Sequence, residues 1–129
     1  MIPLSRQDAR MLSPLTLAYV GDAVHDLHVR SLEAGTGRPV HSLHMDAVSR
    51  VCCRAQSEAL ERIEPTLSAE EAGVVRRGRN CHSRHGAPKG SSPETYTRAT
   101  ALEALLGYLY LSGQDDRMAV LLDSMYTEV

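Results

Sequence analysis

The chain has 129 residues and a mass of 14.1 kDa, enough for one domain with a hydrophobic core, which Leu, Val, Ala and Tyr must fill because Trp and Phe are absent. No apolar stretch reaches the roughly 20 residues of a membrane span, and the N-terminus lacks the apolar segment of a signal peptide. The three cysteines are an odd number, with Cys52 next to Cys53, which favours a reducing, cytoplasmic location over a disulfide framework.

The periodicity is helical throughout and predicts one all-α domain over residues 1–129. Ser13 reads as an N-cap before Pro14, and the helix that begins there runs to about Ala34, ahead of Gly35 and Gly37. A second helical pattern runs from about Val40 to Ile63 and closes before Pro65.

The second half of the chain predicts three more helices around a long loop. Ser68 and Glu71 form a capping box that opens a short helix through about Arg79. Residues 80–92 carry no apolar period and read as a loop. Ser92 and Pro93 repeat the cap-and-proline signal for a helix to about Ser112, and a last helix begins at Asp115 or Asp116.

Two acidic residues lie in otherwise apolar helical patterns. Asp22 follows Val20 and Gly21, and Glu103 is the only charged residue of the thirteen in 99–111. A desolvated carboxylate without a partner costs several kcal/mol, roughly, or else becomes protonated. Each acid could be a core residue bonded to a backbone N–H, a Tyr or an Arg. Alternatively, the two carboxylates share a hard cation such as Mg²⁺, which prefers oxygen ligands.

The helical faces favour burial of both acids. One stripe of the first helix is apolar and Asp22 projects opposite it, beside further apolar residues, so we expect Asp22 to be shielded from solvent. Glu103 shares a face with Tyr96, and small residues would let the two helices approach closely. The stripe is Leu17, Val20, Val24 and Leu27, and the small residues are Ala18, Ala99 and Gly107.

A local basic region is concealed by the overall charge. Between residues 76 and 98 six basic residues face a single acid, Glu94, which gives this segment a net charge of +5. Such a patch on an acidic body indicates local recognition of a polyanion, although a charged loop can also be merely solvated. The basic residues are Arg76, Arg77, Arg79, Arg84, Lys89 and Arg98.

Three blocks of the sequence together resemble the Mini-ribonuclease III branch of the ribonuclease III superfamily. They are Ala18-Tyr19-Val20-Gly21-Asp22-Ala23-Val24, then Arg77-Gly78-Arg79-Asn80, and then the run from Tyr96 to Tyr110. The resemblance implies a helical endonuclease domain without a double-stranded-RNA-binding domain, working as a homodimer on double-stranded RNA. It also implies that the substrate is the precursor of 23S ribosomal RNA, and that a ribosomal protein is a possible partner.

The resemblance assigns roles to individual residues. Asp22 and Glu103 match the catalytic and metal-binding acids, with Mg²⁺ as cofactor and Mn²⁺ as a substitute. The ion would polarise the phosphate, activate water and stabilise the leaving 3′-oxygen, which yields 5′-phosphate ends. The family's other two acidic positions fall on Ala18 and Thr100, a departure that the Mini branch shares. We expect the six basic residues to contact RNA. Asp26 shares a helix face with Asp22 and Tyr96 shares one with Glu103, so we expect both to have secondary roles at the site.

Three other readings remain open at this point. The chain could be a non-catalytic RNA-binding or ribosome-assembly module, a reading supported by the missing acids, or a simple helical adaptor. The six histidines form three His-x-x-His pairs, and Cys81 adjoins the third, so a zinc site is conceivable, but no fourth ligand recurs at a convincing spacing. The pairs are His25 and His28, His41 and His44, and His82 and His85.

Overall fold

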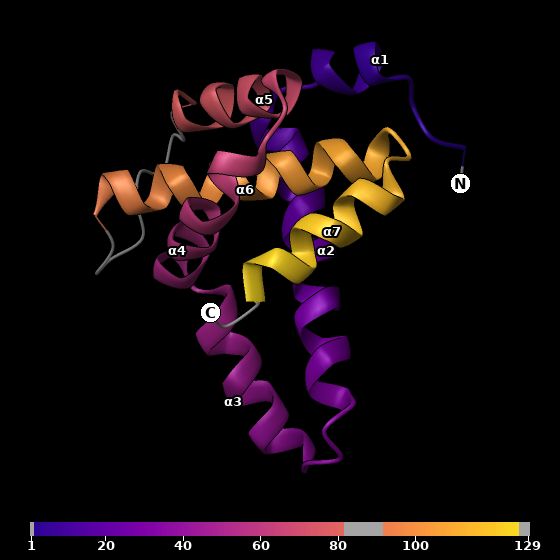
Figure 1. Ribbon diagram of the computed structural model, residues 1–129. Helices are drawn as coiled ribbons and strands as arrows, with labels where there is room; N and C mark the ends of the chain where they lie inside the picture. Colours follow the sequence, from indigo (N-terminus) through magenta and orange to yellow (C-terminus); the bar gives the residue numbers. More distant parts are fainter. Residues whose placement is uncertain (1, 82–91, 127–129) are drawn as a thin grey trace.

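A computed structural model describes residues 2–81 and 92–126, apart from the side chains of residues 46–51. The all-α prediction is confirmed, since the described residues form helices and no strand (Figure 1). Most of the predicted loop, including Arg84 and Lys89, lies outside the described residues. The helices are α1 (Arg6–Met11), α2 (Pro14–Ala34), α3 (Val40–Val51), α4 (Cys53–Ile63), the 3₁₀ turn η1 (Glu64–Thr66), α5 (Ala69–Arg79), α6 (Pro93–Leu111) and α7 (Asp115–Tyr126).

The three predicted helix starts are confirmed by the hydrogen bonds that satisfy them. The Ser13 hydroxyl accepts from the Leu15 N–H, and the Ser92 hydroxyl accepts from the Thr95 N–H. The capping box at Ser68 is complete, because the Glu71 carboxylate also accepts from the Ser68 N–H at 2.8 Å. Side-chain caps satisfy N–H groups that have no partner within the helix, so they fix where each helix begins.

Two features of the chain differ from the prediction. The single helix expected over 40–63 is wrong: Cys52 adopts an extended conformation and divides it into α3 and α4. The division follows from packing, since α3 lies along α2 whereas α4 packs on α6 and α7. The short helix α1 was missed, although Ser5 caps it by accepting from the Asp8 N–H.

Helix α6 is the centre of the molecule. Its residues from Ala99 to Leu109 are all buried except Glu103, which is half-buried. Helices α2, α4, α5 and α7 pack around it, and Figure 1 shows α2 crossing it steeply. A helix that is apolar on all sides is buried within a protein or spans a membrane, and no helix of the described chain is long and apolar enough to cross a membrane.

Two glycines allow the backbones of α2 and α6 to touch. A Cβ atom on Gly107 would lie 1.9 Å from the Leu17 carbonyl oxygen, and one on Gly21 would lie 1.6 Å from the Glu103 carbonyl oxygen. No other residue type fits at either position without moving a helix. Gly107 was expected from the sequence to allow the close approach of the two helices, and Gly21 allows it in the same way.

The buried face of α2 is not the one expected from its apolar stripe. Leu27, a member of that stripe, is 69% exposed, whereas His25, which lies outside it, is fully buried. The expected shielding of Asp22 is also wrong for the single chain, because this residue is exposed. The reason is that α6 contacts α2 through Leu17, Ala18 and Gly21, which turns the opposite side outward.

We predict that Gly107→Ala destabilises the fold. Alanine is favoured over glycine in a helix by about 1 kcal/mol, but here the added methyl group must push α2 and α6 apart, at an overpacking cost of about 1–3 kcal/mol or more. Urea unfolding followed by circular dichroism measures the change. The matched control is Gly73→Ala in α5, where the new atom meets only the Arg76 guanidinium at 3.8 Å, so stability should hold or rise. A Gly107→Ala protein as stable as the wild type would contradict the close crossing.

Candidate active site

Asp22 and Glu103 meet where α2 crosses α6. Asp22 follows Gly21, whose Cα faces the backbone of Glu103 itself. The short distance between the backbones brings the two carboxyl groups together, and the Glu103 side chain is hydrogen-bonded to that of Asp22. The structure thus joins two acids that are distant in the sequence, as the hypothesis of a shared cation requires.

The pair holds a proton at neutral pH. Burial, then the hydrogen bond to Asp22 and the charge of that carboxylate, raise the pKa of the Glu103 carboxyl to about 9. Two carboxylates in contact cannot both ionise cheaply, because each disfavours the charge of the other. A neutral Glu103 therefore donates its O–H to Asp22, and a cation placed between them would take over the role of this proton.

The donor set suits a hard divalent cation. Both groups offer carboxylate oxygens, and Mg²⁺ commonly takes one or two protein carboxylates while water and substrate phosphate complete its coordination. The described residues contain no cluster of three His, Cys, Asp or Glu side chains that could hold a metal ion. At the two positions where the resemblance expects further acids, Ala18 and Thr100 are buried, and the Thr100 hydroxyl donates to the Tyr96 carbonyl at 3.0 Å.

The residues expected in secondary roles have partners of their own. Asp26 accepts from Arg30 Nε at 3.0 Å, one turn along α2, and its side chain is 39% exposed. Tyr96 is half-buried near the start of α6.

His25 bonds to Tyr126 of α7, and its Nδ1 lies 3.3 Å from the Gln56 amide nitrogen. Burial, with His28 close by, lowers the pKa of His25 to about 4. It is therefore a neutral anchor for α2.

The basic residues divide by their contacts. Arg76 is exposed on α5, whereas Arg77 donates to the carbonyls of Arg10 and Leu12 at 2.6 and 3.2 Å and so ties down the end of α1. Arg79 Nη2 donates to Glu64 Oε1 at 2.6 Å, and Arg98 Nη2 lies 3.6 Å from the same oxygen. Glu64 carries no local signal in the sequence, because nothing near it in the chain marks a carboxylate that two distant arginines share.

The ribonuclease III domain family matches residues 15–114, which include the whole crossing of α2 and α6. The chain belongs to the ribonuclease III family. It is 45% identical to the Mini-ribonuclease 3 of Thermoanaerobacter sp. (strain X514), over 93% of this chain and 84% of that protein. It is 47% identical to the Mini-ribonuclease 3 of Symbiobacterium thermophilum, over 88% and 87% respectively.

A solved structure supports the same assignment. The crystal structure of protein FN1578 from Fusobacterium nucleatum is similar, with a TM-score of 0.81 and 28% sequence identity. The similarity covers 90% of this chain and 93% of that one. The resemblance seen in the three sequence blocks is therefore confirmed at the level of family and fold.

We predict that Mg²⁺ binding releases a proton. Below pH 9 Glu103 is protonated, so the ion must displace about one proton, and its affinity should rise with pH by up to about tenfold per unit. Calorimetric titration of Mg²⁺ at pH 7, in two buffers of different protonation enthalpy, measures the number of protons released. Glu103→Gln should abolish the release because a side-chain amide does not ionise in this pH range. Binding that releases no proton and is independent of pH would contradict a metal site at this pair.

Proposed function

We propose that this chain is a Mg²⁺-dependent endoribonuclease that hydrolyses phosphodiester bonds of double-stranded RNA and leaves 5′-phosphate ends. Membership of the ribonuclease III family supports the endonuclease activity and the duplex substrate. The observation that carries the proposal is the meeting of two carboxyl groups that are distant in the sequence, Asp22 and Glu103, at a glycine crossing. Such a pair, with no third acidic ligand near it in the described chain, fits an ion completed by substrate phosphate.

Each residue of the pair has a distinct part in the reaction. Asp22, exposed on α2 at the edge of the crossing, presents its carboxylate to incoming substrate, while Glu103 lies deeper in the crossing. Asp22 and Glu103 would hold Mg²⁺, which would supply a Lewis acid that polarises the scissile phosphate and lowers the pKa of the attacking water. Glu103 would have to release its proton to solvent for both carboxylates to bind the ion. The backbone contact of α2 with α6 keeps both carboxylates in place, which avoids reorganisation during the reaction.

The precursor of 23S ribosomal RNA is our proposed substrate, with the reaction taking place in the cytoplasm. Support comes from the resemblance to the Mini-ribonuclease III branch, and the odd number of cysteines, with Cys52 next to Cys53, is consistent with a reducing compartment. A ribosomal protein as a further partner rests on the same resemblance. Mapping the ends of 23S RNA in cells depleted of this chain tests the proposal, and fully matured ends there would refute it.

We predict that Asp22→Asn and Glu103→Gln each reduce duplex cleavage at least about a hundredfold, because each removes a charged ligand of the ion while nearly preserving shape. The assay follows a long labelled RNA duplex with Mg²⁺ or with EDTA. Asp116→Asn, the same charge change at an exposed position of α7, is the control. Full activity in either active-site variant would exclude the assignment. Wild-type binding without cleavage would favour the alternative, a non-catalytic RNA-binding module on the same scaffold.

A homodimer is the proposed working form. The exposed side of α2 next to Asp22 carries Leu15 and Tyr19, which are 40% and 82% exposed. Apolar side chains gathered on one helix face mark an interaction site more often than isolated ones do. A second copy seated there would bring two active sites to one duplex, as the resemblance implies.

We predict that Tyr19→Glu converts the protein to a monomer in light scattering, since a buried unpaired charge opposes association. The matched control is Val120→Glu on α7, which adds the same charge at an apolar position that is 54% exposed. A monomeric wild type, or a dimeric Tyr19→Glu variant, would contradict this arrangement.

A further inference from the structure

We propose that Arg79 and Arg98 form one binding site for a backbone phosphate of the RNA duplex, which Glu64 occupies in part when no RNA is bound. This inference rests on the proposed function and adds a specific contact to it. Two arginines of the basic region between residues 76 and 98 would thus form a single anion-binding site, for which the Glu64 carboxylate competes with phosphate.

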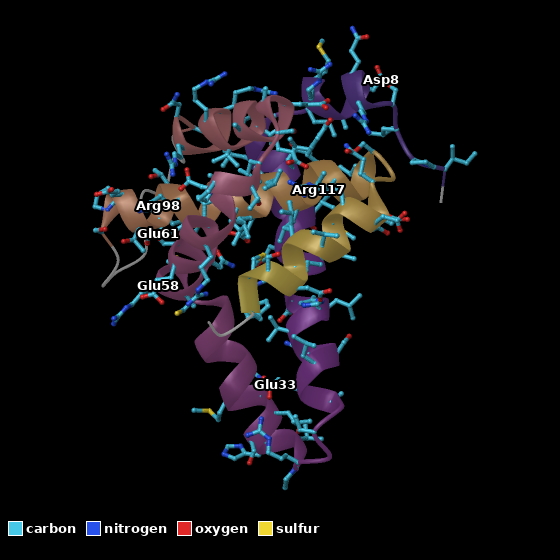
Figure 2. The ribbon with its side chains drawn as sticks, viewed as in Figure 1. Asp8, Glu33, Glu58, Glu61, Arg98 and Arg117 are labelled. Carbon is cyan, nitrogen blue, oxygen red and sulfur yellow. The ribbon has the colours of Figure 1, made fainter. Side chains whose placement is uncertain are left out.

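Packing brings the two arginines together from opposite ends of the intervening loop. Arg79 is the last residue of α5, and Arg98 lies in the second turn of α6. Gly78 makes this possible, because a Cβ there would lie 2.7 Å from the Cα of Ala101, so the end of α5 rests directly on α6. Glu64, in the turn that follows α4, then meets both side chains. In Figure 2 the labelled Arg98 lies where α6 passes α4.

The contacts within this cluster leave positive charge unmatched. One oxygen, Glu64 Oε1, serves both guanidinium groups, at 2.6 Å from Arg79 and 3.6 Å from Arg98. The second distance exceeds that of a hydrogen bond, so charge alone holds Arg98 to Glu64. One carboxylate against two guanidiniums leaves a net charge of +1.

The hydrogen-bonding capacity of the arginines is also unfilled. The Nε atoms of both side chains are buried and have no hydrogen-bond partner within the part of the chain that the structure describes. The side chains nevertheless remain 38% and 24% exposed, so their outer amino groups can be reached. The buried Nε atoms are out of reach of a ligand, whereas guanidinium amino groups at the surface can bind phosphate oxygens through charge-assisted hydrogen bonds. If these arginines only held helices together, we would expect more of their N–H groups to have hydrogen-bond partners.

The cluster lies at a useful distance from the active site. Arg98 precedes Glu103 by five residues on α6, a rise of about 7.5 Å along the helix axis at 1.5 Å per residue. A duplex is recognised by contacts to several phosphates along its grooves. Five residues also rotate about 140° around the helix axis at 3.6 residues per turn, so the arginine pair lies on another side of α6 and would contact a phosphate away from the scissile bond.

The test compares two substitutions with opposite expected effects. Arg98→Gln removes a charge but keeps a long polar side chain, so RNA binding should weaken roughly tenfold and the slope of log Kd against log salt should fall by about 1. Glu64→Gln removes the competitor, so binding should tighten several-fold and the slope should steepen. Binding is measured with EDTA, on a labelled duplex over a series of potassium chloride concentrations. Thermal unfolding confirms that each variant is folded.

The control is Arg54→Gln, which removes the same charge from an exposed pair with Glu58 on α4. If Arg98→Gln matches this control in affinity and slope, or if Glu64→Gln fails to tighten binding, the cluster is only a brace between helices and the inference is overturned. The proposed function is judged separately by cleavage with Mg²⁺. A wild type that cleaves duplex RNA while the Arg98 and Glu64 variants bind like the control refutes this inference alone. A wild type that neither binds nor cleaves refutes both.

Discussion

The direct contact of the α2 and α6 backbones at Gly21 and Gly107 is the constraint on which the rest of the structure depends. Because neither position has a side chain, the helices cross closely enough for carbonyl groups to fill the space of the missing Cβ atoms. This approach buries the middle of α6, turns the opposite face of α2 outward, and sets the carboxyl of Glu103 against that of Asp22. The raised pKa of Glu103 and its interaction with Asp22 therefore follow from the close packing of α2 on α6.

The arginines of this molecule either stabilise the fold or remain available to bind RNA, and the composition of the chain does not show which arginine does which. Several arginines serve the fold: Arg77 binds backbone carbonyls at the end of α1, and Arg117 pairs with the buried Glu71 through two hydrogen bonds of 2.9 Å. Arg76 is exposed and open to a ligand, whereas Arg79 and Arg98 stand between these cases, partly paired with Glu64. A net charge of +5 counted along the sequence thus overstates the number of cations available to RNA.

Most of the features that were predicted correctly from the sequence are local. Caps at Ser13, Ser68 and Ser92 depend on a few neighbouring residues, so they could be read directly and were found in place. The break at Cys52 and the burial of His25 depend on which distant helices each segment touches, and no local pattern contains that information. The same reason explains why Asp22 was wrongly expected to be shielded. The pairing of Asp22 with Glu103 was predictable because isolated acids in apolar helices need partners, but Glu64 carried no such signal.

The crossing also has a consequence for how the protein is made. Asp22 lies near the beginning of the chain and Glu103 near its end, so their contact closes a long stretch of chain at a cost in chain entropy. During synthesis the N-terminal helices emerge first. Helix α2 contacts α3 and α5 as well, but its most extensive contact is with α6, which emerges after them. A nascent or truncated chain that ends before α6 carries one half of the site and cannot assemble it. Assembly of the acidic pair thus coincides with completion of the core, and incomplete chains lack the means to cut the RNA around them.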